Sequence, residues 1–259
     1  MEGPENLPPA AILACSKCGS GNPEAKRFCP HCGFPSALVY KQPISALQSI
    51  EPAIKAYAAL FGANLLFLSF KITPKSVHLP IEILIDLLFY SIVAFAVYPF
   101  RSRIHFLTRR FFNAPYPPHN MVSLALLTGA GIYLYFRLAV WLGFLTLSYI
   151  EKADLGTLRV PWVFLSTVLL APISEEIFFR GYLFRKFRLI LKPGQAILLQ
   201  GLLFGILHLN PAMYLSHTMM GILYGFFRYR TKSLLPGITC HVLWNFCVVG
   251  AEYWRLTTN

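Results

Sequence analysis

The chain has 259 residues, of which 56% are hydrophobic and only 13% are charged, and its mean hydropathy is +0.54. Soluble domains are about 45–50% apolar and about 25% charged, so this composition excludes an ordinary water-soluble globular protein. The formal net charge of +12 agrees with Lys and Arg gathered in cytoplasmic loops that face anionic lipid. No basic stripe on a soluble fold indicates a nucleic-acid partner.

The first 33 residues are polar and contain two cysteine pairs. Cys15–Cys18 and Cys29–Cys32 are both C-x2-C pairs, and ten residues separate them. Four thiolates at this spacing are typical of a closed, structural zinc site, and a segment too short for a core would fold on metal binding. We therefore predict a zinc ribbon over residues 1–33 with these four cysteines as ligands.

Two disulfides are the alternative for these cysteines. The first ten residues have neither the basic start nor the apolar run of a signal peptide, so we expect the amino terminus in the cytoplasm. Disulfides are rare in that compartment, which favours zinc.

Long apolar segments begin near residue 53, after a proline-containing stretch at 34–52 that is typical of a linker. A helix needs about 20 apolar residues to cross a bilayer. We expect an all-α polytopic membrane protein, in which residues 53–259 form a bundle of seven transmembrane helices, with eight as the alternative. The predicted spans are 53–72, 79–100, 120–149, 160–184, 195–209, 212–229 and 234–254.

Alternate loops between these spans are basic, which places them and the amino terminus in the cytoplasm and predicts a multi-pass protein of the inner or plasma membrane. Two GxxxG pairs, Gly201/Gly205 and Gly221/Gly225, predict close helix packing. The basic residues follow the second, fourth and sixth spans: Arg101, Arg103, Arg109, Arg110; Arg185, Lys186, Arg188, Lys192; Arg228, Arg230 and Lys232.

Two adjacent carboxylates, Glu175 and Glu176, end the apolar part of the fourth span. Ionisable residues inside a membrane are functional-site candidates by default. Glu176 and Arg180 are four residues apart and share a helix face, so we expect them to pair. Glu175 is turned by ~100° from Glu176 and is free to face a cavity. A helix end at the membrane surface, where charges cost little, is the alternative.

The later spans add three more polar residues. His208 ends the fifth span, and His241 and Asn245 lie four apart on one face of the last span. In hydrocarbon such groups must find partners. By contrast, we expect His217 to form hydrogen bonds within the bundle. Near the second span, Glu82 and Asp86 are expected either to be solvated or to line a water-filled entrance, with Arg137 as a possible partner.

Together, Glu175-Glu176-x-x-x-Arg180, Phe204-x-x-x-His208 and His241-x-x-x-Asn245 resemble the three motifs of the CAAX prenyl protease and bacteriocin-processing (CPBP) family of intramembrane endopeptidases. The resemblance covers residues 160–250. It implies that Glu175 and His208 activate a water, that His241 and Asn245 stabilise the oxyanion, that Glu176 and Arg180 hold the helix, and that Phe204 packs.

The resemblance implies a membrane-associated peptide or protein substrate, with prenylated CAAX-like and bacteriocin-related proteins as candidates. Glu175, His208 and His241 are also possible ligands of a catalytic zinc, but HExxH is absent and we favour a metal-free site. A non-catalytic scaffold or bacteriocin-immunity protein with the same fold is the main rival. A transporter is less favoured, because it predicts related halves that the sequence lacks.

Overall fold

The computed structural model describes residues 13–15, 18–22, 29, 31–33, 43–72, 79–98, 118–143 and 155–258. Near the amino terminus, β1 (Leu13–Ala14) pairs antiparallel with β2 (Gly21–Asn22). Each cysteine pair ends in a glycine with positive φ, 71° at Gly19 and 69° at Gly33. This conformation is open to glycine at little cost, so both turns depend on it.

The rest of the described chain is mostly helical, and a helix overlaps every predicted span. The expected all-α polytopic fold is therefore confirmed. One long helix runs from Arg159 to Phe187 and consists of five consecutive segments, which are those from α6 to α8 in the following sentence. The helices are α2 (Pro43–Ile72), α3 (Leu79–Val97), α5 (Pro118–Trp141), α6 (Arg159–Val163), η4 (Phe164–Leu170), α7 (Ala171–Glu176), η5 (Ile177–Leu183), α8 (Phe184–Phe187), α9 (Pro193–Leu207), α10 (Pro211–Thr231) and α11 (Leu235–Thr258).

Some helix ends differ from the predicted spans. Helix α2 begins at Pro43, within the predicted linker, and passes through Pro52. Pro43 lies in the first turn of the helix, where proline is well tolerated because its missing N–H has no partner to lose, whereas Pro52 lies inside the helix. Helix α5 ends at Trp141, and residues 144–149 of the predicted third span lie outside the described residues. The division into ribbon, linker and membrane domain stays a prediction.

Three helical stretches of the described chain are long and apolar enough to cross a membrane: Leu79–Val97, His119–Leu138 and Arg159–Phe187. Helix α9 is apolar but shorter. Large apolar side chains point outward from these helices, including Phe95 at 86% exposure and Leu127 at 72%. Such surfaces are favourable against lipid tails and unfavourable in water. The protein is an integral membrane protein.

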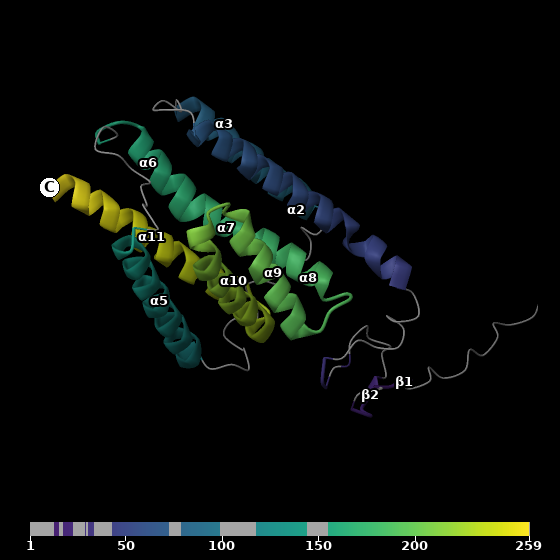
Figure 1. The fold of residues 1–259 in the computed structure, drawn as a ribbon. Coiled ribbons are helices and arrows are strands. Elements are labelled where there is room, and N and C mark those ends of the chain that lie inside the picture. Colours follow the sequence, from purple (N-terminus) through teal and green to yellow (C-terminus); the bar gives the residue numbers. More distant parts are fainter. Residues whose placement is uncertain are drawn as a thin grey trace, which may run out of the picture.

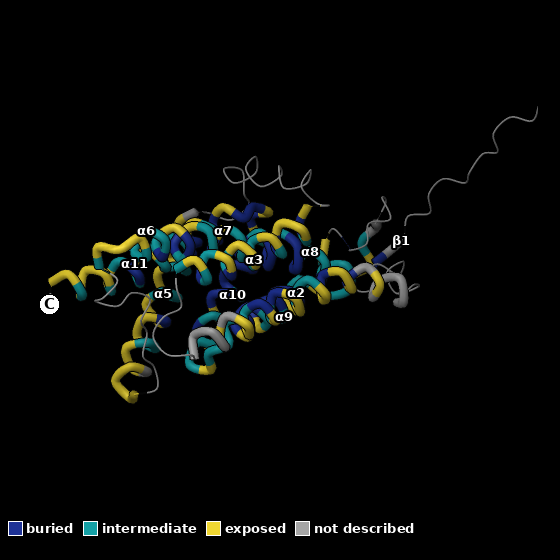
Figure 2. Tube along the Cα trace, turned by 90° about the horizontal axis from the view of Figure 1, so that it is seen from above, coloured by how far each residue is buried: buried dark blue, intermediate teal, exposed yellow. Residues whose placement is uncertain are grey.

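The long helix from α6 to α8 runs through the middle of the bundle (Figure 1). The α2–α3 hairpin packs on one side of it, and α9, α10 and α11 contact it elsewhere, while α5 packs against α10. Buried segments concentrate on the central helices, and the outer faces of α2, α3 and α5 are exposed (Figure 2). The two glutamates of the fourth predicted span therefore lie in the centre of the fold.

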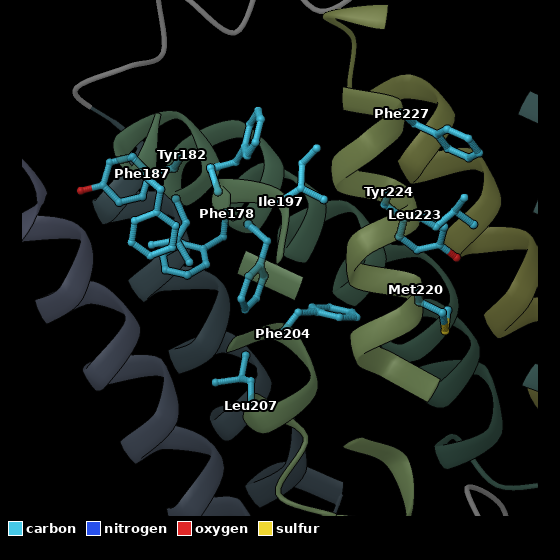
Figure 3. Packing of buried hydrophobic residues seen from close by; sticks show 14 of the residues in the cluster. Phe178, Tyr182, Phe187, Ile197, Phe204, Leu207, Met220, Leu223, Tyr224 and Phe227 are labelled. Atoms are coloured by element: carbon cyan, nitrogen blue, oxygen red, sulfur yellow. The ribbon is translucent and has the colours of Figure 1, made fainter. Parts of the chain in front are cut away.

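Aromatic side chains fill the space around the long helix. Phe178 and Phe179 of η5, Phe204 of α9 and Phe227 of α10 are all at most 1% exposed. Phe179 meets Phe204 edge to face, with their ring centroids 5.1 Å apart. Figure 3 shows several of these side chains, with Phe204 pointing from α9 toward α10. This packing fixes α9 and α10 against the segment that carries the glutamates.

Helices α9 and α10 approach each other at their glycines, as the GxxxG spacing predicts. A Cβ added at Gly221 would lie 2.7 Å from the Cα of Gly201, closer than real Cβ contacts. Buried Gln200 donates to the backbone oxygen of Gly221 over 2.7 Å. Small residues at both positions let the two backbones touch.

Candidate active site

Both glutamates lie on α7, a short α-helical segment between two π-helical ones. The N–H of Ala171 bonds the oxygen of Ser166, and the N–H of Phe184 bonds that of Phe179, so these turns close from i to i+5. Segments of this kind are rare and occur often at functional sites. Here neighbouring carbonyls also accept from other helices: Tyr90 donates to Ser166 O over 3.3 Å.

Glu176 is fully buried and held by two partners. Its Oε1 is 2.8 Å from Nη1 of Arg180 and 3.3 Å from Nδ1 of His241. The i, i+4 ion pair expected from the spacing is therefore present. The other oxygen, Oε2, has no hydrogen-bond partner in the described residues and faces Gly237, where an added Cβ would lie 2.6 Å from it.

Arg180 is also fully buried, and aromatic rings surround its guanidinium. The carbon Cζ is 4.4 Å from the ring centroid of Phe204, 5.4 Å from that of Tyr224 and 5.7 Å from that of Phe179. A cation over an aromatic face is attracted by the ring quadrupole, most strongly where water is excluded. One carboxylate and three rings thus stabilise this charge.

Glu175 has a different environment. Its side chain is 13% exposed, and its Oε2 is 3.7 Å from Nε2 of His241. It lines a cavity of about 140 Å³ between α2, α3 and α7, together with Asn64, Asp86 and Tyr90. His241 therefore stands between the two glutamates, with one nitrogen toward each, and only Glu175 faces open space.

His208 joins this group through Phe204. It directly follows Leu207, the last residue of α9, and its Nδ1 donates to the backbone oxygen of Phe204 over 2.9 Å. The Phe204 ring lies edge-on to both histidines, with centroid distances of 4.9 Å to His208 and 5.7 Å to His241. Phe204, to which the resemblance assigns a packing role, thus contacts both histidines.

Asn245 lies one turn further along α11 than His241. Its Nδ2 donates to the oxygen of Thr167, in the first π-helical segment, over 2.8 Å. It lines a second, larger cavity of about 310 Å³ rather than the cavity of Glu175. The structure therefore joins Glu175, Glu176, Arg180 and His241 by direct contacts and places Asn245 beside them on a separate cavity.

Two residues near this site were not selected from the sequence. His217 does form its expected bond within the bundle, from Nδ1 to Met213 O, but its ring also lies against His208. Gly237 has no side chain and so leaves room for the carboxylate of Glu176. A histidine inside a span is a recognisable signal, whereas no local pattern marks Gly237.

The acidic residues of the second span have specific partners. Glu82 is buried and forms an ion pair of 2.8 Å with Arg159, while Asp86 accepts a hydrogen bond from Trp162 over 3.1 Å. Arg137, the partner considered from the sequence, is exposed on α5. Asp86 does line the cavity of Glu175, as an entrance residue would.

The four amino-terminal cysteines form a separate cluster. None of the four is disulfide-bonded, and their sulfurs lie within 4.8 Å of one another. The pairs Cys15–Cys32 and Cys18–Cys29 have Sγ–Sγ distances of 3.6 Å. Bonds of ~2.3 Å from a tetrahedral zinc would separate two sulfurs by ~3.8 Å, whereas a disulfide needs ~2.05 Å. The cluster therefore has the dimensions of a zinc site.

Hydrogen bonds with Ser20 lower the pKa of the Cys18 thiol to about 6. A thiolate, rather than a thiol, is the form that binds metal. Among the described residues, these cysteines are the one group of three or more metal-ligating side chains whose ligand atoms lie this close together.

A polytopic helical bundle in which one glutamate pairs with an arginine and the next faces a cavity is the arrangement that the intramembrane-endopeptidase hypothesis requires. Comparison with protein families agrees with this class. Residues 157–247 match the family described as type II CAAX prenyl endopeptidase, Rce1-like, which confirms the resemblance found in the motifs. The matched segment contains all six residues of the three motifs that were selected as site residues, and the match supports a peptidase.

One similar protein is YyaK of Bacillus subtilis (strain 168), an uncharacterized protein. It is 27% identical to this chain over an aligned length of 176 residues. The alignment covers 61% of this chain and 58% of YyaK. The match thus spans less than two thirds of the relative. No solved structure matches the chain significantly.

Proposed function

We propose that this protein is an intramembrane endopeptidase that hydrolyses a peptide bond of a membrane-associated substrate with a water activated by Glu175 and His208. The observation that supports this most is the unequal environment of the two glutamates. Glu176 is occupied by Arg180 and His241, whereas Glu175 lines a cavity. A general base needs a carboxylate that is not committed to an arginine and that water can reach, and the surroundings of Glu175 support this role.

In the proposed reaction Glu175 takes a proton from a water held between it and His208. The hydroxide attacks the scissile carbonyl carbon, and the proton then passes to the leaving amine. Asn245 keeps a second Nδ2 hydrogen beyond the one given to Thr167, and this hydrogen would stabilise the oxyanion. We assign His241, which lies between the two carboxylates, to the oxyanion together with Asn245, as the family resemblance implies.

Glutamine substitutions test the assignment. Purified wild-type protein should cleave members of a panel of membrane-associated peptides, with the products identified by mass spectrometry. Glu175→Gln should stay folded and lose cleavage, because it removes the base and keeps the shape. A Glu175→Gln protein that cleaves like the wild type would contradict the mechanism. If the wild type binds peptides without cutting any of them, the scaffold reading is favoured instead.

The substrate class follows from the family resemblance. Prenylated CAAX-like and bacteriocin-related proteins are the candidates, and the panel should contain both with their unlipidated counterparts. We propose membrane lipid and a peptide or protein substrate as partners, and no nucleic acid. We place the protein in the inner or plasma membrane with the amino terminus in the cytoplasm. No catalytic metal is required by the proposed chemistry.

For the cysteine cluster we propose a structural zinc ion bound by Cys15, Cys18, Cys29 and Cys32. The sulfur separations, which are too long for disulfides and close to those around a tetrahedral zinc, support this proposal. Elemental analysis of the full chain should find one zinc per protein, and Cys29→Ser should lower that content. Paired oxidation of the four cysteines in a zinc-free protein would favour disulfides.

A further inference from the structure

His217 is held beside His208 by a short turn. Helix α9 ends at Leu207, and Asn210 caps α10 by accepting from the N–H of Ala212 over 3.1 Å. Between them Leu209 has a φ of 53°, which side chains other than glycine rarely adopt. This tight reversal puts the rings of His208 and His217 against each other, with centroids 3.9 Å apart and planes inclined by 44°.

The hydrogen bonds of His217 fix its tautomer. Its Nδ1 is 3.0 Å from the backbone oxygen of Met213. A carbonyl can only accept, so Nδ1 carries the hydrogen and the neutral ring leaves a lone pair on Nε2. This Nε2 has no hydrogen-bond partner in the described part of the chain. Because no donor in the described residues satisfies this acceptor, the site is suited to a ligand that donates.

The larger cavity places this acceptor beside Asn245, the proposed oxyanion donor. His217 lines the 310 Å³ cavity together with Asn245 and Thr167, and apolar side chains such as Trp244 and Phe136 form its other walls. A peptide that enters an apolar cavity inside a membrane must find acceptors for its backbone N–H groups. His217 Nε2 offers one of them.

We infer that His217 is a substrate-binding residue, whose Nε2 accepts a hydrogen bond from a backbone N–H of a peptide lying in this cavity. The inference rests on the proposed endopeptidase function and adds a residue outside the three family motifs. It gives the cavity an orientation: the peptide backbone runs past His217 and Asn245, and an apolar side chain or group occupies the space beside Trp244 and Phe136.

Two substitutions at His217 test whether the position of the acceptor atom matters. Asn can replace the Nδ1 bond to Met213 but does not extend to the position of Nε2, whereas Gln does extend to it. The probe is a quenched fluorescent peptide ending in a farnesylated C-a-a-X sequence. Loss of one neutral hydrogen bond should raise KM about threefold to tenfold in His217→Asn with little change in kcat. His217→Gln should restore most of the affinity.

His119→Asn on α5 is the matched control, since His119 is exposed and outside the site. Melting temperatures in detergent should show that all three variants are folded. An unchanged KM in folded His217→Asn would overturn the inference, and so would a fall in kcat alone, because that would mean that His217 acts only through His208.

A binding measurement keeps this test independent of the proposed function. Fluorescence anisotropy of the labelled peptide, measured on Glu175→Gln protein, should give a weaker Kd when His217→Asn is added, by the same factor as KM. Full cleavage by Glu175→Gln would contradict the proposed base and leave the anisotropy result to decide on His217. An unchanged Kd would overturn the His217 assignment while the base assignment stands.

Discussion

Adjacent residues can have opposite roles when a helix turns them into different surroundings, and the two glutamates of α7 illustrate this. Glu176→Gln would leave the Arg180 charge without its carboxylate in a site with 0% exposure. Breaking a buried ion pair costs about 3–5 kcal/mol. We therefore expect a lower melting temperature in detergent for Glu176→Gln, and partial recovery in Glu176→Gln/Arg180→Gln.

The recovery should be incomplete, because the three rings around Arg180 also lose their cation. Glu175→Gln is the matched control, since it changes the neighbouring carboxylate without breaking this pair. A destabilised Glu175→Gln together with a normal Glu176→Gln would reverse the two roles.

Gly237 offers a test through a residue that carries no charge. An added methyl group would lie 2.6 Å from Glu176 Oε2 and 3.4 Å from the Cβ of Tyr224. Gly237→Ala must therefore displace the carboxylate, and we expect lower stability and about tenfold or greater loss of cleavage, as misplaced catalytic groups produce. Gly250→Ala on the same helix meets no atom within 4 Å and should be neutral or slightly stabilising. Similar cleavage by both variants would contradict this role of Gly237.

At this scale the sequence predicted what spacing alone determines. An i, i+4 relation is enough to pair Glu176 with Arg180. The rings around Arg180 come from three different segments, and the contact of His217 with His208 depends on a tight turn. Neither follows from a periodic pattern, because both arise from tertiary packing.

Among the elements, the α9–α10 pair depends most directly on small residues. Gly221→Ala would bring a Cβ to 2.7 Å from the Cα of Gly201, and backbone atoms cannot move aside as a flexible side chain can. We expect the helices to separate, with about 1–3 kcal/mol of destabilisation and reduced activity, because His208 and His217 both depend on this pair. Thermal unfolding in detergent is the measurement.

Gly194→Ala is the control within the same hairpin, since an added Cβ there has no atom within 4 Å. If Gly221→Ala and Gly194→Ala unfold at the same temperature, the close approach does not limit stability. The helices themselves were predictable from long apolar runs, but the π-helical segments were not, because hydropathy carries no information on i to i+5 bonding.

The orientation of the whole molecule in the membrane can be tested directly. The alternating basic loops predict that a cysteine introduced at Asp154 reacts with a membrane-impermeant reagent from outside the cell, whereas one at Arg109 does not. Both positions lie outside the described residues, so the prediction rests on the sequence. The native cysteines, including Cys240 and Cys247, should first be replaced so that only the introduced cysteine can react. Equal labelling of both sites would reverse or abolish the proposed orientation.

Composition predicted the class of molecule, and apolar segments predicted its helices. The packing order of those helices was beyond such patterns, because lipid-facing and core-facing surfaces are both apolar. Phe95 and Phe179 look alike in the sequence, yet one is 86% exposed and the other fully buried.

The π-helical segments have a consequence for changes in chain length. A turn closed from i to i+5 contains one residue more than an α-helical turn. Deleting Leu169 therefore lets Phe164–Leu170 shorten to an α-helix without rotating Glu175. Deleting Ile173 in α7 has no such reserve and swings the following residues by ~100°. The long helix can thus absorb the loss of a residue beside its reactive segment but not within it.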